Sequence, residues 1–259
     1  MNQTVLITGA SMGIGAAIAR SFARPGFDII LTARSGHALE ELATRLRASS
    51  KSKIWVYTAD LADPAGPQLL FDRVNAAGHQ VDILINNAGF GLWGHFRETS
   101  LEKELAMIQV NIASLTALTK LFLGPMVERG FGRICNIAST AAFQPGPLMA
   151  VYYATKAYVL HFTEALANEL QGKGVKAICV CPGPTESQFV ANAELGPSRL
   201  FRRSLPSAQS VAEQVYAATM AGKTVHVCGW GNRILIQLHR FVPRRFATFV
   251  VRRMQEKAG

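Results

Sequence analysis

The chain of 259 residues is 49% hydrophobic and 17% charged, and its formal net charge at pH 7 is +10. This length suits one α/β domain or two small ones, and the ordinary glycine and proline content, without repeats or low-complexity segments, excludes a fibrous or disordered chain. The positive charge is partly local, because residues 230–259 hold seven Lys or Arg and one acid, 7 − 1 = +6, which leaves about +4 for the rest.

Short apolar segments alternate along the chain with segments of helical length. The predicted strands are 3–8, 27–32, 53–58, 81–86, 133–138, 175–181 and 224–228. The predicted helices include 13–24, 36–48, 101–123, 153–171 and 208–221. Several strands are apolar throughout, which is typical of strands covered on both faces. The alternation predicts an α/β fold, a doubly wound, Rossmann-like parallel sheet of about seven strands with helices on both faces. We expect a single domain over 1–259 with its core at about 3–228.

The turn after the first strand reads TGASMGIG, residues 8–15, and leads directly into a predicted helix. Its glycines, Gly9, Gly13 and Gly15, let the backbone approach a phosphate and let the helix pack closely on the strand. The helix N-terminus adds N–H groups and a positive dipole end. A plain glycine-rich turn is the alternative, but the position on the first strand–helix connection favours a dinucleotide site. The residues between the glycines that we expect to contact the cofactor are Ser11, Met12 and Ile14.

The second strand ends in LTAR. Enzymes that prefer NAD typically carry an acid at this point, which binds the ribose 2′-hydroxyl. This chain has Ala33 followed by Arg34, and an arginine can bind a 2′-phosphate through two hydrogen bonds. The sequence therefore favours NADP(H) over NAD(H), with a solvated arginine at a helix start as the alternative.

Polar residues also occur where they would face such a cofactor. INNAG, residues 85–89, ends the fourth strand, although asparagines there also commonly cap a turn. Asn111 lies in an otherwise apolar helix, and a buried asparagine needs hydrogen-bond partners. Those partners are either something that binds there or a neighbouring backbone. Ser139 follows the fifth strand, and ligands bind at the carboxyl ends of parallel strands.

The segment VYYATKAY, residues 151–158, contains three tyrosines and one lysine. Residues i and i+4 share a helix face, so Lys156 is paired with Tyr152 rather than with Tyr153 or Tyr158. A tyrosine has a usual pKa of ~10, and a nearby ammonium lowers it towards neutrality, which favours proton transfer. Tyr152 is therefore the predicted acid–base group, and packing or cleft lining is expected of the other two.

The motifs TGxxxGxG, NNAG, Asn111, Ser139, Tyr152-x-x-x-Lys156 and CPGP follow one another in this order between residues 3 and 228. This order and spacing resembles the short-chain dehydrogenase/reductase family. The resemblance implies an NADP(H)-dependent oxidoreductase that interconverts a secondary alcohol and a ketone or 3-oxoacyl-type carbonyl. By this resemblance Tyr152 exchanges the proton and Ser139 hydrogen-bonds the carbonyl oxygen. Lys156 lowers the pKa of Tyr152 and binds the nicotinamide ribose, and Asn111 holds a water of a proton relay.

The resemblance also assigns cofactor contacts outside the glycine loop. They are Asp60, Leu61, Asn87, Ala88, Gly89, Tyr152, Lys156, Pro182, Gly183, Thr185 and Ser187. Ser187 replaces a threonine that is frequent in the family, but it keeps the hydroxyl expected to bind the nicotinamide carboxamide. Family members usually pair through the helices that correspond to 101–123 and 153–171, so a homo-oligomer, either dimer or tetramer, is expected.

Two other functions are compatible with this scaffold. A nucleotide-sugar epimerase would share it, but the chain is short for that class, and NNAG followed by a compact lid argues against it. A non-catalytic NADP-binding sensor or membrane-associated scaffold would not need the Ser139, Tyr152 and Lys156 set, which is intact here. An enzyme is therefore the favoured interpretation.

The run 183–210 contains several prolines and no strand pattern, and a long irregular segment after a strand is commonly a lid. We expect it to enclose an apolar substrate pocket together with 90–98 and 140–149. The candidate pocket residues are Trp93, Phe143, Leu148, Met149 and Phe189. Three arginines of the lid either bind an acidic group of the substrate or form a solvated face; they are Arg199, Arg202 and Arg203.

The basic tail 230–259 is expected to form two helical pieces joined at Pro243. After that proline, Phe246, Phe249, Val250 and Met254 recur at helical spacing, and most of the arginines lie on other faces. Basic amphipathic helices often lie on anionic membranes. Packing on the domain or on a partner subunit is the alternative. Nucleic acid is not an expected partner, because no recognisable binding module accompanies the charge.

The four cysteines form no CxxC pair, and three lie in strand-like runs; they are Cys135, Cys179, Cys181 and Cys228. We expect buried reduced thiols and no metal site. The N-terminus lacks a signal-peptide pattern, and no uninterrupted apolar run approaches the ~20 residues of a spanning helix. These features predict a cytoplasmic protein, with peripheral membrane contact through 232–259 left open.

Overall fold

The computed structural model describes residues 2–186, 205–239 and 241–256. Several predicted residues lie outside this part of the chain, and they are Ser187, Phe189, Arg199, Arg202 and Arg203.

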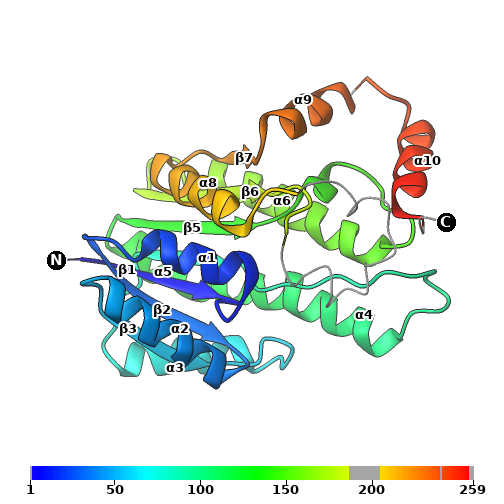
Figure 1. Cartoon of the computed structure of the whole chain (residues 1–259). Coiled ribbons are helices and arrows are strands. Elements are labelled where there is room, and N and C mark those ends of the chain that lie inside the picture. Colours follow the sequence, from blue (N-terminus) through cyan, green and yellow to red (C-terminus); the bar gives the residue numbers. More distant parts are fainter. Residues whose placement is uncertain (1, 187–204, 240, 257–259) are drawn as a thin grey trace.

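Seven parallel strands form one sheet in the order β3-β2-β1-β4-β5-β6-β7, as Figure 1 shows. The strands are β1 Gln3–Thr8, β2 Phe27–Ala33, β3 Ile54–Thr58, β4 Ile83–Asn86, β5 Gly132–Ile137, β6 Val175–Cys181 and β7 Val225–Val227. Every predicted strand is present, with small shifts at its ends. The strand order reverses between β1 and β4, which is the position where open α/β sheets bind ligands at the carboxyl ends of their strands.

The helices alternate with the strands as predicted. They are α1 Gly13–Phe22, α2 Gly36–Ser49, α3 Gly66–Ala76, α4 Leu101–Ile108, α5 Leu115–Glu128, α6 Ala150–Glu169, α8 Ala208–Ala221, α9 Trp230–His239 and α10 Arg244–Gln255. The helix predicted over 101–123 is present as the continuous helical segment Leu101–Glu128, in which a π-helical turn, Gln109–Ser114, joins α4 to α5. The two helical pieces expected around Pro243 are α9 and α10.

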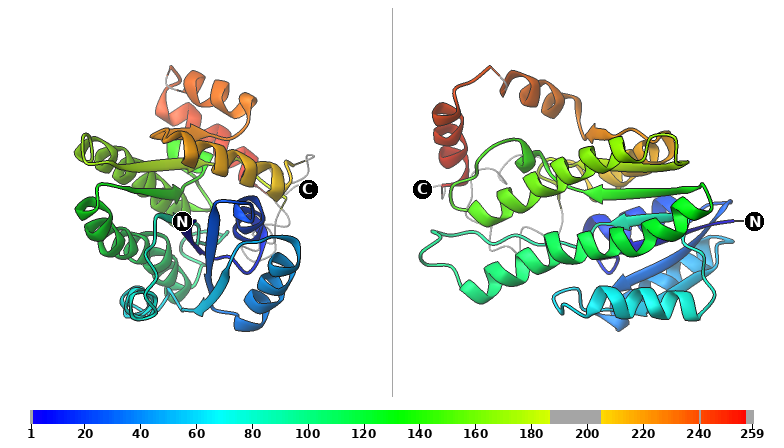
Figure 2. Two further views of the ribbon diagram at one scale, coloured as in Figure 1. Left: turned by 90° about the vertical axis from the view of Figure 1, so that its left-hand side faces the viewer. Right: turned by 180° about the vertical axis from the view of Figure 1, so that it is seen from behind.

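Helices cover both faces of the sheet, and Figure 2 shows the two layers. Successive residues of a strand point to opposite faces. On β1, Val5 and Ile7 pack in a core shared with α1, α2 and α8, while Leu6 packs in a second core with α3, α5 and α6. These side chains are fully buried, so the throughout-apolar strands reflect a sheet that is covered on both sides.

The continuous helical segment Leu101–Glu128 is long and apolar enough to cross a membrane by length and composition alone. It behaves as a core helix in this fold. Its residues Leu118, Phe122 and Met126 are buried in the second core, against side chains of the sheet. Packing in the core thus accounts for the apolar residues of its C-terminal half.

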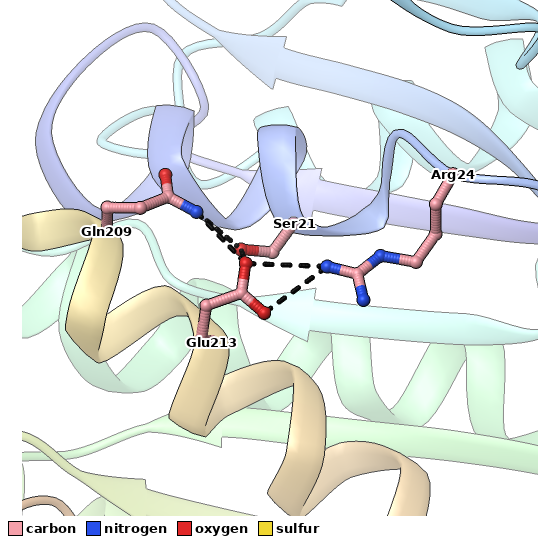
Figure 3. Close-up of polar contacts among 4 residues, drawn as sticks. All are labelled: Ser21, Arg24, Gln209 and Glu213. Carbon is pink, nitrogen blue, oxygen red and sulfur yellow. Dashed lines mark hydrogen bonds and ion pairs between the residues drawn. The ribbon is translucent and has the colours of Figure 1, made fainter.

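A polar cluster joins α1, the helix after the glycine loop, to α8. Glu213 of α8 accepts hydrogen bonds from Ser21 at 2.7 Å and Gln209 at 3.0 Å and forms an ion pair with Arg24 at 3.2 Å (Figure 3). The hydrogen bond from Ser21, followed by the contacts with Arg24, lowers the pKa of Glu213. The cluster links α1, which follows the glycine loop, to α8, which follows the predicted lid.

Candidate active site

The carboxyl ends of the strands surround one large cleft of about 1100 Å³. It collects every predicted site residue within the described ranges except Asn111. Those that line it are Gly9, Ser11, Met12, Gly13, Ile14, Gly15, Arg34, Asp60, Leu61, Asn87, Ala88, Gly89, Ser139, Tyr152, Lys156, Pro182, Gly183 and Thr185. Five of the six ordered motifs, together with Arg34, Asp60 and Leu61, therefore meet in one place.

The glycine loop is held against the end of β4 by side-chain hydrogen bonds. Asn87 donates from Nδ2 to the carbonyl oxygens of Thr8 and Gly9, at 2.9 and 3.2 Å. In return, the Thr8 hydroxyl accepts the backbone N–H groups of Asn87 and Ala88, both at 2.9 Å. These hydrogen bonds between NNAG and the glycine loop thus fix the shape of the glycine loop.

Two glycines of the loop leave no room for a side chain. Gly9 has φ of +64°, which is strained for other residues, and a Cβ there would lie 2.9 Å from the Ala88 Cα. A Cβ on Gly15 would overlap the carbonyl oxygen of Gly9. The α1 N-terminus carries no side-chain cap, whereas Ser35 caps α2. An open helix end beneath a glycine loop fits a pyrophosphate.

The ends of β5 and α6 place the three candidate catalytic side chains together. Ser139 begins the short 3-10 turn Thr140–Phe143 and forms a side-chain hydrogen bond with Tyr152. Lys156, one helical turn after Tyr152, donates from Nζ to the Ile137 carbonyl oxygen at 2.9 Å. Its Nζ lies 5.9 Å from the centroid of the Tyr152 ring. The i, i+4 pairing expected from the sequence is therefore present.

Burial dominates the electrostatics of this set. It raises the pKa of Tyr152 well above its usual value, against the opposing hydrogen bond from Ser139. Burial also lowers the pKa of Lys156 to about 8. The expected lowering of the Tyr152 pKa by Lys156 is not found, because burial of the hydroxyl penalises the phenolate and dominates its pKa. A protonated Tyr152 suits proton donation to a substrate.

Asn111 lies in the π-helical turn and is buried. Its Nδ2 donates to the Phe90 carbonyl oxygen and the Thr155 hydroxyl, both at 3.0 Å, and its Oδ1 accepts the Phe90 N–H at 3.1 Å. The side chain thus fixes the loop after NNAG to α6. This matches the alternative of a packing hydrogen bond to neighbouring backbone. A role in a proton relay stays a prediction.

A buried polar network beside the cleft was missed by sequence reasoning. Asn86 donates to Asn136 at 2.9 Å and to Thr119 at 3.0 Å, and Asn136 donates to Thr163 at 2.9 Å. All four residues are at most 2% exposed. They join β4, β5, α5 and α6. Asn86, the first residue of NNAG, was the available signal.

The tail contributes a wall of the cleft, which was also missed. Asn232, Leu235 and Ile236 of α9 line it together with residues of α10. Gln255 of α10 donates from its side-chain Nε2 to the Tyr153 hydroxyl at 2.8 Å. The backbone carbonyl oxygen of Gln255 accepts the Trp93 Nε1–H at 2.9 Å.

The predicted pocket walls are only partly correct. Met149 lines the cleft. Trp93 instead packs beside it, near Tyr153 and Val251, and Phe143 packs against the buried cluster of Leu160 and Cys181. Leu148 is buried and adopts a φ of +68°. Aromatic composition alone did not distinguish residues that line the cleft from residues that pack behind it.

Residues 3–197 match the short chain dehydrogenase family. Sulfoacetaldehyde reductase 2 of Chromohalobacter salexigens is 36% identical over 85% of this chain and 90% of its own length. Ketoacyl reductase HetN of Nostoc sp. is 33% identical over 87% of this chain and 77% of its own length.

Solved structures agree in fold. A short-chain dehydrogenase from Sphingobium yanoikuyae, in complex with NADPH, has a TM-score of 0.82 and 31% identity, over 92% of this chain and 94% of its own. The bulky-bulky ketone specific alcohol dehydrogenase from Comamonas testosteroni has a TM-score of 0.78 and 29% identity, over 92% of both chains. With its motifs gathered in one cleft and matched in sequence and fold, the chain belongs to the short-chain dehydrogenase/reductase family of oxidoreductases.

Proposed function

We propose that this oxidoreductase uses NADP(H) to interconvert a ketone or 3-oxoacyl-type carbonyl and a secondary alcohol. The observation that carries the proposal is the convergence of Ser139, Tyr152 and Lys156 on the cleft that the glycine loop also lines. The hydrogen bond between Ser139 and Tyr152 supports a joint action on one oxygen atom. A cofactor sensor without catalysis would have no use for this arrangement.

The residues present fit a dinucleotide. Gly9 and Gly15 clear the backbone for the pyrophosphate, and the open end of α1 attracts its charge. Arg34 directly follows β2, is exposed and lines the cleft, so its guanidinium is available to a 2′-phosphate. When bound, NADPH supplies the hydride for the carbonyl carbon. The NADPH complex of the Sphingobium relative supports this choice of cofactor.

The side chains then handle the oxygen and its proton. Ser139 hydrogen-bonds the carbonyl oxygen and fixes its position. Tyr152, kept protonated because burial raises its pKa, donates its proton to that oxygen as negative charge develops. Lys156 is held by the Ile137 carbonyl oxygen beside Tyr152, and its expected role is to bind the nicotinamide ribose.

Apolar side chains of the cleft support an apolar substrate. Leu92, Met149 and Val251 line it near Tyr152. A reductase named for ketoacyl substrates and one named for bulky ketones are among the relatives. We expect NADPH oxidation with bulky ketones or 3-oxoacyl thioesters in a panel that also contains small ketones and sulfoacetaldehyde. Absence of turnover across the whole panel would favour the non-catalytic alternative.

Replacement of Arg34 by alanine should change cofactor preference. A charged bidentate hydrogen bond contributes ~1.5–3 kcal/mol, so we expect the dissociation constant of NADPH to rise roughly 10- to 100-fold. Binding of NADH should hardly change. Fluorescence titration with both cofactors measures this without turnover, and Arg45→Ala on α2, outside the cleft, is the matched control. An unchanged NADPH/NADH ratio in Arg34→Ala would show that the arginine is only a solvated helix-start residue.

Exposed apolar residues on the expected pairing helices support a homo-oligomer. Leu101, Leu105 and Ile108 of α4 and Tyr158 of α6 are exposed in the single chain. Pairing through these helices in a dimer or tetramer would bury these side chains.

A further inference from the structure

The last two helices carry large apolar side chains on their outer faces. Trp230, Ile234 and Leu238 recur every four residues on α9, and Phe241 follows in the connection to α10. Trp230 and Phe241 are 77% and 87% exposed. On α10 the outward apolar residues are Phe246, Phe249 and Val250. Single exposed apolar residues are ordinary in soluble proteins, but a concentration of them indicates a contact surface.

The inner faces of the same helices are already used. On α10, Ala247, Val251 and Gln255 are buried, and Gln255 is held by Tyr153 and Trp93. The larger apolar residues of α10 lie on the other side, so packing on the domain does not explain them. Figures 1 and 2 place α9 and α10 on the β7 side of the molecule, opposite α2 and α3.

The charge around this surface is strongly positive. Arg244, Arg245, Arg252 and Arg253 of α10 are all exposed, and Glu256 is the only acid between residues 230 and 259. The Arg253 guanidinium lies 5.3 Å from the centroid of the Phe249 ring, so a cation stands directly beside an outward aromatic residue. Basic and aromatic side chains side by side suit the boundary between lipid headgroups and acyl chains.

The charge distinguishes between two candidate partners for this apolar face, a second copy of the chain and a membrane. A second copy meeting the chain here would bring two segments of +6 together. An anionic lipid surface instead complements the arginines, at ~1 kcal/mol for each one near the surface, and accepts the aromatic side chains. We propose that the outer faces of α9 and α10, centred on Trp230, Phe241, Phe246 and Phe249, dock on an anionic membrane.

This docking gives the cleft a source of substrate, an extension that depends on the reductase function proposed above. Leu235 of α9 is exposed and also lines the cleft, so the wall of the cleft continues into the docking surface. An apolar carbonyl compound dissolved in the lipid would enter the cleft along this wall. The substrate class that follows is a lipid-soluble ketone or 3-oxoacyl compound.

The test is sedimentation of the full chain with vesicles of phosphatidylcholine alone or of equal parts phosphatidylcholine and phosphatidylglycerol. We expect binding to the anionic vesicles that weakens with salt. The variant Phe246→Ser/Phe249→Ser should bind roughly tenfold or more weakly, since each phenylalanine loses the burial of its ring in lipid. Leu69→Ser, at an equally exposed residue of α3 on the opposite side, should bind as the parent does. Arg244→Gln/Arg245→Gln should weaken binding, and Lys51→Gln/Lys53→Gln, at exposed lysines before β3, should not.

Equal pelleting of parent and Phe246→Ser/Phe249→Ser would overturn the proposal. So would a change from dimer to monomer in that variant without vesicle binding by the parent, which would assign the face to a second copy. Vesicle binding requires no turnover, so its failure is separate from failure of the reductase function. If the protein both binds vesicles and reduces carbonyl compounds, Phe246→Ser/Phe249→Ser should reduce a long-chain ketone held in vesicles more slowly than the parent does. Its rate with a water-soluble ketone should equal that of the parent.

Discussion

The variant Tyr152→Phe is expected to lose roughly 100- to 10,000-fold in kcat for NADPH-dependent carbonyl reduction, the range of general acid catalysis. The substitution removes only the hydroxyl that shares a hydrogen bond with Ser139. Among the described residues of the cleft, Lys156 is held by the Ile137 carbonyl oxygen and the Tyr153 hydroxyl by Gln255, so neither replaces this hydroxyl. Steady-state rates with a carbonyl substrate from the panel measure the effect.

Tyr153→Phe is the matched control. Its ring stands beside that of Tyr152, at 6.1 Å between centroids, and its hydroxyl accepts a hydrogen bond from Gln255. Loss of that bond should lower stability by about 1 kcal/mol and leave kcat within roughly tenfold of the parent. Both variants should still bind NADPH in a fluorescence titration, which verifies folding. Equal rates in the two variants would contradict the assignment of Tyr152 as the acid.

The sheet could be predicted because the composition of its strands reflects how they are buried. Strands such as VLI in β1 and ILI in β4 are apolar at consecutive positions, which only a sheet covered on both faces requires. Helix α3 is weaker in sequence, since Leu70 and Val74 are its only large apolar residues that are buried. The π-helical turn at 109–114 has no compositional signal. It depends on Asn111 reaching the Phe90 backbone, a contact distant in sequence.

The cleft could be predicted because its glycines, its asparagines and the Tyr–Lys spacing form short motifs, each typical of one chemical role. The tail shows what such reasoning leaves open. Its strongest amphipathic pattern, Phe246, Phe249, Val250 and Met254, is exposed, whereas the smaller residues Ala247 and Val251 are buried. Small side chains let α10 approach the loop that carries Trp93, and only the three-dimensional surface determines which face is used. Burial also decides the pKa of Tyr152, and helical spacing says nothing about burial.

Lys156→Met should make the protein more stable at neutral pH while it removes most of the activity. Burial lowers the pKa of Lys156 from its usual 10.5 to about 8. A tenfold change in proton affinity corresponds to ~1.4 kcal/mol, so retaining the ammonium at pH 7 costs about 3 kcal/mol of folding free energy. Methionine avoids that cost but leaves the Ile137 carbonyl oxygen without its donor, at about 1 kcal/mol. A net gain of about 1–2 kcal/mol in unfolding free energy is expected.

The pH dependence of this difference identifies its cause. Between the folded pKa of about 8 and the unfolded value of 10.5, the unfolded parent binds more protons than the folded parent. The parent's unfolding free energy therefore rises with pH in that window relative to Lys156→Met, and the variant's advantage disappears. Denaturant titrations at pH 7, 9 and above 10.5 measure this, with the exposed Lys120→Met of α5 as the control that should show no such trend. Two results would mean that burial of the Lys156 ammonium does not destabilise the fold. One is a variant that is less stable than the parent at pH 7, and the other is a difference in unfolding free energy that stays constant between pH 7 and pH 10.5. If the prediction holds, the protein retains a buried lysine at the expense of stability, which is the pattern expected of a residue kept for function.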